Sequence, residues 1–98
     1  MAGQRVDFHP EAVAEARAAY VWYEQRDPRA AAAFLGELDH AVARVLESPR
    51  AWPVFVGRAR RCLFDRFPFY LVYRELDDRV EVIAVVHAKR RPGYWRDR

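Results

Sequence analysis

The sequence predicts an α+β domain of order β-α-α-β-β-β, in which a helical hairpin packs on one face of a small, mainly antiparallel sheet. Two observations predict it. Apolar residues in the first half of the chain recur at three- and four-residue steps, the period of an amphipathic helix. The second half alternates apolar with polar residues and is rich in β-branched and aromatic side chains, which is typical of strands. We expect one domain over 1–98, of which 88–98 form a basic C-terminal tail.

The first half is expected to form one short strand and two helices. Residues 5–8 alternate as a strand does. Residues 10–26 begin with a proline, which suits the first turn of a helix. Asp27-Pro28 then supplies an N-cap and a first position for a second helix, which ends before Ser48-Pro49. Because almost no linker separates the helices, they should lie antiparallel.

The second half is expected to form three strands, over 58–64, 69–76 and 79–87. If Asp77-Asp78 is a two-residue hairpin turn, position i of one strand faces position 155 − i of the next. The face under the helices would then pair Phe69, Leu71 and Tyr73 with Val86, Ala84 and Val82. The other face would carry Tyr70, Val72 and Arg74 opposite Val85, Ile83 and Glu81, with His87 at its end beside Tyr70.

This second face mixes aromatic, aliphatic, cationic and imidazole groups, so it is too apolar for ordinary surface and too polar for core. Such a face can bind RNA, by stacking on Tyr70 and by arginine charge, or it can bind an amphipathic peptide. In the alternative, a loop or the C-terminal tail covers it. Tyr94 and Trp95 could then hold the tail against the fold.

Charge is divided unevenly along the chain. Residues 1–56 carry six arginines and eight acidic residues, a net charge of −2, whereas residues 57–98 carry eleven basic and six acidic residues, a net charge of +5. A basic C-terminal half indicates an anionic partner, either nucleic acid or an acidic protein segment. An arginine-rich surface that only keeps the protein soluble is the alternative.

The sequence lacks the signals of a disulfide, a metal site, a targeting segment and a membrane span. Cys62 is the single cysteine, so no internal disulfide can form. The histidines at 9, 40 and 87 are too scattered to suggest a metal site, and we expect no metal and no cofactor. No targeting segment is visible and no apolar run is long enough to span a bilayer, so we expect the protein to be cytoplasmic.

A set of short motifs recurs in a particular order along the chain. They are His9-Pro10-Glu11-Ala12, Tyr23-Glu24, Phe34-Leu35-Gly36-Glu37-Leu38, Arg60-Arg61-Cys62, the stretches 67–73 and 80–87, and Arg90-Arg91-Pro92. In order and spacing they resemble the RelE/ParE superfamily of bacterial type II toxin–antitoxin toxins, also called plasmid stabilisation proteins, over essentially the whole chain. The resemblance implies a growth-inhibiting toxin in a toxin–antitoxin hetero-oligomer, whose antitoxin wraps around the toxin and masks its active surface.

The resemblance leaves two target classes. RelE-like members cut mRNA in the ribosome, and ParE-like members poison DNA gyrase. Metal-independent RNA cleavage needs a base, an acid and cations for the phosphate. His87 is the candidate acid. The candidate phosphate-binding cations are Arg58, Arg60, Arg61, Arg74 and Arg90. Some members use a glutamate as base near 54–58, where this chain has no carboxylate, and Glu81 would be neutralised by Arg74.

Gyrase poisoning needs no catalytic set, and the stretches 60–62 and 80–87 look more like ParE-type sequences. We therefore lean to a ParE-like gyrase poison. A ribosome-dependent mRNA endoribonuclease and a non-toxic RNA-binding module remain as alternatives. The residues expected to contact the target or the antitoxin are Arg58, Tyr70, Glu81, Arg91, Tyr94 and Trp95.

Overall fold

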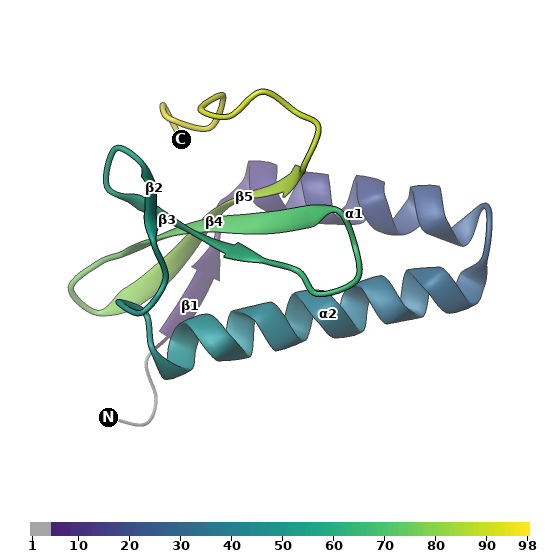
Figure 1. The fold of residues 1–98 in the computed structure, drawn as a ribbon, viewed down its shortest axis with the longest axis horizontal. Helices are drawn as coiled ribbons and strands as arrows, with labels where there is room; N and C mark the ends of the chain where they lie inside the picture. Colours follow the sequence, from purple (N-terminus) through teal and green to yellow (C-terminus); the bar gives the residue numbers. More distant parts are fainter. Residues whose placement is uncertain (1–4) are drawn as a thin grey trace.

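Two helices pack against one face of a five-stranded sheet in the computed structural model, which describes residues 5–98 (Figure 1). The strands lie in the order β1-β5-β4-β3-β2, with β1 parallel to β5 and the other pairs antiparallel. The elements are β1 (Arg5–Phe8), α1 (Pro10–Glu24), α2 (Pro28–Glu47), β2 (Val54–Val56), β3 (Ala59–Leu63), β4 (Phe69–Glu75) and β5 (Arg79–His87). The predicted α+β fold class is confirmed.

Local sequence signals place the element boundaries well. The His9 side chain accepts a hydrogen bond from Glu11 N, and Asp27 accepts one from Arg29 N at 3.0 Å, so both helices have an N-cap and the predicted Asp27 cap is confirmed. Helix α1 ends two residues before the predicted residue 26. Strand β2 was not predicted, because three residues are too few to show a period and its pairing with β3 is irregular.

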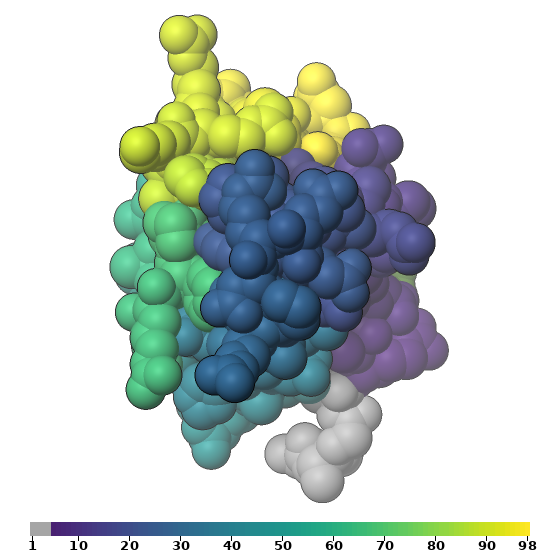
Figure 2. Space-filling view, turned by 90° about the vertical axis from the view of Figure 1, so that its right-hand side faces the viewer, coloured from purple at the N-terminus to yellow at the C-terminus, as the bar shows by residue number. Residues whose placement is uncertain are grey.

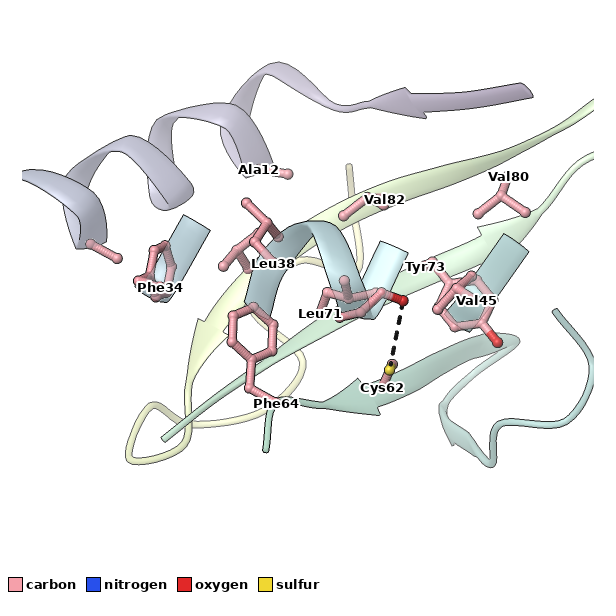
Figure 3. Close-up of a cluster of buried hydrophobic side chains, with 13 residues drawn as sticks. Ala12, Phe34, Leu38, Val45, Cys62, Phe64, Leu71, Tyr73, Val80 and Val82 are labelled. Atoms are coloured by element: carbon pink, nitrogen blue, oxygen red, sulfur yellow. Dashed lines mark hydrogen bonds between the residues drawn. The ribbon is translucent and has the colours of Figure 1, made fainter. Parts of the chain in front are cut away.

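The first core lies between the helices and the sheet (Figure 3). Phe34 of α2 is fully buried at its centre, with ring centroids 5.2–5.7 Å from those of four other aromatic residues, Tyr23, Phe64, Phe67 and Phe69. Edge-to-face and offset contacts of this kind add to the gain from burial alone. Cys62 is fully buried here as a small core residue, with its thiol 4.0 Å from the Ala41 carbonyl oxygen.

The hairpin between β4 and β5 has the predicted turn but not the predicted register throughout. Leu76 N donates to Arg79 O at 2.7 Å, and Arg74 pairs with Glu81, with Nη2 and Oε1 2.6 Å apart. Further along, the register shifts by one residue, because Tyr73 pairs with Val82 whereas Val72 pairs with Ala84. Ile83 is the extra residue of a β-bulge.

The bulge overturns the face assignment for the rest of β5. Four predicted pairs beyond the bulge are wrong: Phe69–Val86, Tyr70–Val85, Leu71–Ala84 and Val72–Ile83. The observed partners of Phe69, Tyr70, Leu71 and Val72 are, in that order, His87, Val86, Val85 and Ala84. Val85 therefore joins the helix-side core, and the His87 ring lies edge-on to Phe69 on that side. The predicted position of His87 beside Tyr70 is wrong for the same reason. A one-residue slip moves every later side chain to the opposite face.

The second face of the sheet is covered and forms a second core. The C-terminal tail crosses over it, as the yellow segment of Figure 1 shows. Trp95 is 1% exposed and packs against Phe55 and Tyr70, with ring centroids 6.0 and 6.2 Å apart. The prediction of an open binding face is therefore wrong, and the alternative in which the tail covers it holds. Within residues 5–98, no helix is long and apolar enough to cross a membrane.

Replacing Phe34 by alanine tests the helix-side core. The change removes a fully buried ring that touches both helices and the sheet, so the free energy of unfolding should fall by about 3–5 kcal/mol. The neighbouring Leu35 is 41% exposed, and Leu35→Ala should cost less than about 1 kcal/mol. Urea unfolding followed by circular dichroism measures both. Similar losses for the two variants would contradict this description of the core.

Candidate functional site

The Glu15 carboxylate of α1 joins a helix, a strand and the C-terminal tail. Its Oε1 accepts hydrogen bonds from Val85 N at 3.0 Å and from Arg98 Nη1 at 2.8 Å. Its Oε2 accepts from the Tyr94 hydroxyl at 2.6 Å and from Arg98 Nη2 at 3.2 Å. Arg90 Nη1 lies 3.7 Å from Oε2. The side chain is largely buried, and burying a carboxylate is tolerable only with partners of this kind.

Glu15 and Arg98 take the place of a strand along one edge of β5. Strand β1 ends at Phe8, and His9 N makes the last backbone bond on that side, to Val82 O at 2.9 Å. Further along β5, Glu15 accepts from Val85 N, and Arg98 Nη1 donates to Ile83 O at 3.0 Å. These side chains satisfy backbone groups that a longer β1 would otherwise have bonded.

The tail docks through a turn and two aromatic residues. Gly93 has φ +95°, a left-handed conformation that suits glycine and lets the chain turn back over the sheet. Burial raises the pKa of the Tyr94 hydroxyl well above its ordinary value, and the hydrogen bond to Glu15 raises it further. The same hydrogen-bonded carboxylate raises the pKa of Arg98. The expectation that Tyr94 and Trp95 hold the tail to the fold is confirmed.

A cavity of about 570 Å³ opens between α1 and the ends of β4 and β5. Its walls are mostly apolar and are contributed by Glu15, Ala18, Ala19, Trp22, Tyr23, Pro68, Phe69, Val85, His87 and Arg90. His87 is half-buried in the wall, and its Nδ1 accepts a hydrogen bond from Lys89 N at 3.1 Å. The cavity thus places one imidazole and one guanidinium against an apolar floor.

The arginines expected to bind phosphate are dispersed. Arg60 donates to Trp52 O at 2.6 Å and so fixes the loop before β2, on the helix side of the sheet. On the opposite face, the Arg61 guanidinium lies 3.8 Å from the Phe55 ring centroid. Arg74 is paired with Glu81 on that same face, near the turn of the β4–β5 hairpin and far from His87.

Three further arginines, Arg90, Arg58 and Arg91, differ in position from these three. Arg90 stacks over the Tyr94 ring at 3.8 Å and lines the cavity with His87, so it is the one expected cation that the fold brings to the candidate acid. Arg58 lies in the turn between β2 and β3 and is exposed, as is Arg91 in the tail. Neither makes an ion pair with another residue of the described range 5–98.

A comparison with known families identifies the family of this chain. Residues 6–92 match the sequence model of a family described as the ParE toxin of the type II toxin–antitoxin system parDE. The chain belongs to this ParE toxin family. It is therefore the toxin component of a type II toxin–antitoxin module, and its partner is a cognate antitoxin.

The fold of this ParE-family toxin is also found among solved structures. A chain from the chromosomal ParDE toxin–antitoxin system of P. aeruginosa is 17% identical in sequence, and the match covers 88% of the toxin and 97% of that chain, with a TM-score of 0.77. At this identity the likeness shows a shared fold. The comparison with curated proteins gives no match.

Sequence analysis missed Glu15, Trp22 and Arg98 of this toxin. A signal for Glu15 was present: it lies three residues after Ala12 and four before Ala19, both buried, and so shares their inward face. A carboxylate on that face requires a partner. The partner, Arg98, is 83 residues away and follows no pattern that would pair the two.

Replacing Glu15 by glutamine should loosen the tail of the toxin. The change removes the charge that binds Arg98 and Tyr94, and hydrogen bonds to a charged group contribute about 1.5–3 kcal/mol each. Backbone amides of residues 94–98 should exchange with deuterium at least about tenfold faster, measured by mass spectrometry. Glu24→Gln, at an exposed position at the other end of α1, is the matched control and should leave this exchange unchanged. If both variants behave like wild type, Trp95 packing alone holds the tail.

Proposed function

We propose that this toxin inhibits growth by binding DNA gyrase, and that it does not cleave mRNA. The observation that carries the proposal is the division of the candidate cleavage groups between the two faces of the sheet, one of which the tail covers. A toxin that acts only by binding its target needs an exposed contact surface and no catalytic residues. The dispersed arrangement of the candidate cleavage groups is compatible with such a toxin. The ParE family of the chain supports the same choice of target.

The chemistry of RNA cleavage fits the arrangement less well. An acid, a base and cations must meet at one phosphate. Glu15 is the carboxylate that shares the cavity with His87, yet Arg98 binds both of its oxygens. Glu81 is held by Arg74 on the other face, with Nη2 and Oε1 2.6 Å apart. Both carboxylates are therefore already engaged by guanidinium groups within the fold.

Base stacking is also disfavoured by the docked tail. Tyr70 and Trp95 are 3% and 1% exposed, so neither ring offers a face to a nucleotide while the tail stays in place. The exposed cations Arg58 and Arg91 remain available, and we assign them to the target contact. The ribonuclease alternative rests on His87 and Arg90, which share the cavity wall.

Expression of the toxin alone should arrest bacterial growth, and co-expression of the antitoxin gene next to it should restore growth. The expected cause is unmasked binding to an essential target. Viable counts after induction, together with immunoblots for soluble toxin, measure the effect. Normal growth at high soluble toxin levels would count strongly against toxicity in this chain.

The target is decided by two assays on the same cultures. A gyrase poison should produce DNA breaks, detected as linearised plasmid, and no discrete mRNA cuts by primer extension. His87→Ala should then reduce toxicity only through local packing against Phe69. If His87 were instead the acid of a ribonuclease, the same change would lower the cleavage rate by about 10²–10⁴-fold. Ribosome-dependent cuts that vanish in His87→Ala would overturn the proposal.

A further inference from the structure

We infer that the cavity beside Trp22 is the site where the antitoxin docks apolar side chains carried on an acidic segment. The proposal rests on the toxin–antitoxin assignment and is independent of the choice between gyrase and mRNA as target.

The walls suit side chains of a protein partner. The polar groups among the cavity residues are few, and they include Glu15, whose oxygens are already engaged by the tail. Trp22 forms one side and is 51% exposed, although burial of a tryptophan is strongly favourable. A volume of about 570 Å³ falls within the range of about 300–1,000 Å³ that is typical of ligand pockets.

Helix α1 exposes apolar side chains as well as burying them, although Glu11, Arg17 and Glu24 are also exposed on it. Ala12 and Ala19 are buried against the sheet, whereas Val13, Val21 and Trp22 are exposed on the helix surface. Exposed apolar surface of this kind marks interaction sites in soluble proteins.

The charges around the opening are positive. The Arg26 guanidinium stacks over the Trp22 ring at 3.7 Å, and Arg90 lines the opposite wall. Lys89, next to Arg90, is exposed. Neither Arg26 nor Lys89 has a carboxylate partner among the residues that the structure describes. An apolar cavity with a cationic rim is complementary to apolar side chains flanked by Asp or Glu.

The cavity lies at an accessible end of the molecule. Figure 2 looks onto this end, where the α1–α2 turn in blue meets the β3–β4 loop in green and the start of the tail in yellow-green. A second, shallower hollow lies on the outer side of α1. Ala18 and Trp22 line both hollows, whereas Ala14 lines only the shallower one. This difference provides a matched pair of substitutions on one helix.

The test fills each hollow with the same side chain. Ala18→Phe places a ring in the mouth of the cavity, and Ala14→Phe places one in the shallower hollow, four residues earlier on α1. Both alanines are exposed, so both variants should fold, and thermal unfolding checks this. The probe is the purified product of the adjacent antitoxin gene, titrated onto each toxin by calorimetry. We expect Ala18→Phe to weaken binding at least about tenfold and Ala14→Phe less than about twofold.

Trp22→Ala provides a second approach, because it removes one wall without adding bulk and should also weaken binding at least about tenfold. Wild-type affinity in both Ala18→Phe and Trp22→Ala would overturn the proposal. Equal losses in Ala18→Phe and Ala14→Phe would also overturn it, since the whole outer face would then be the contact. Two further results would overturn the proposal if the affinity for the antitoxin stays unchanged in Ala18→Phe. In the first, Ala18→Phe abolishes self-association of the toxin; in the second, it abolishes binding of an RNA oligonucleotide.

Growth assays separate this proposal from the one on the target. Ala18→Phe should still arrest growth when expressed alone, but co-expressed antitoxin should rescue it poorly. If wild-type toxin fails to arrest growth, the proposed toxicity fails, while the calorimetric comparison still decides where the antitoxin docks. If Ala18→Phe is rescued as well as wild type at equal expression, the docking proposal fails.

Discussion

The ion pair between Glu15 and Arg98 joins helix α1 to the C-terminal tail, which makes the second face of the sheet a core. A sheet of five strands with helices on one side leaves its other side bare unless another segment covers it. The tail supplies that cover through Trp95, and Glu15 fixes where the tail runs. The same carboxylate satisfies Val85 N where β1 has ended, so one side chain serves both the edge and the face of the sheet.

Local rules of the sequence predict much of this fold. The Asp27 N-cap, the Asp77-Asp78 turn and the pair Arg74–Glu81 follow from residues close together in the chain. The bulge at Ile83 does not, because residues 82–86 are all apolar and suit either face. A run without alternation carries no register, so the packing of Val85 against the helices decides it. The error in the position of His87 follows from that single residue.

The candidate site was predicted less completely, because charge composition does not distinguish structural from functional arginines. Arg60 and Arg61 were expected to bind phosphate, yet one bonds the Trp52 carbonyl and the other stacks on Phe55. A guanidinium has five donors and a flat apolar face, so it can join loops and aromatic rings in the fold. Arg98 does the same for the tail. Such contacts cross long sequence separations, and periodicity is silent about them.

The cavity and the docked tail of the toxin meet at Arg90, and the geometry there limits how one can influence the other. Arg90 lines the cavity, stacks on Tyr94 and lies 3.7 Å from Glu15, which is longer than the 2.8 Å bond from Arg98 to the same carboxylate. Arg98 therefore carries most of the charge compensation, and Arg90 can turn toward an arriving carboxylate at little cost. An acidic segment that enters the cavity would thus find a cation without displacing the tail. The covered face of the sheet would remain covered in the complex, so this antitoxin segment would bind on the helix side of the molecule.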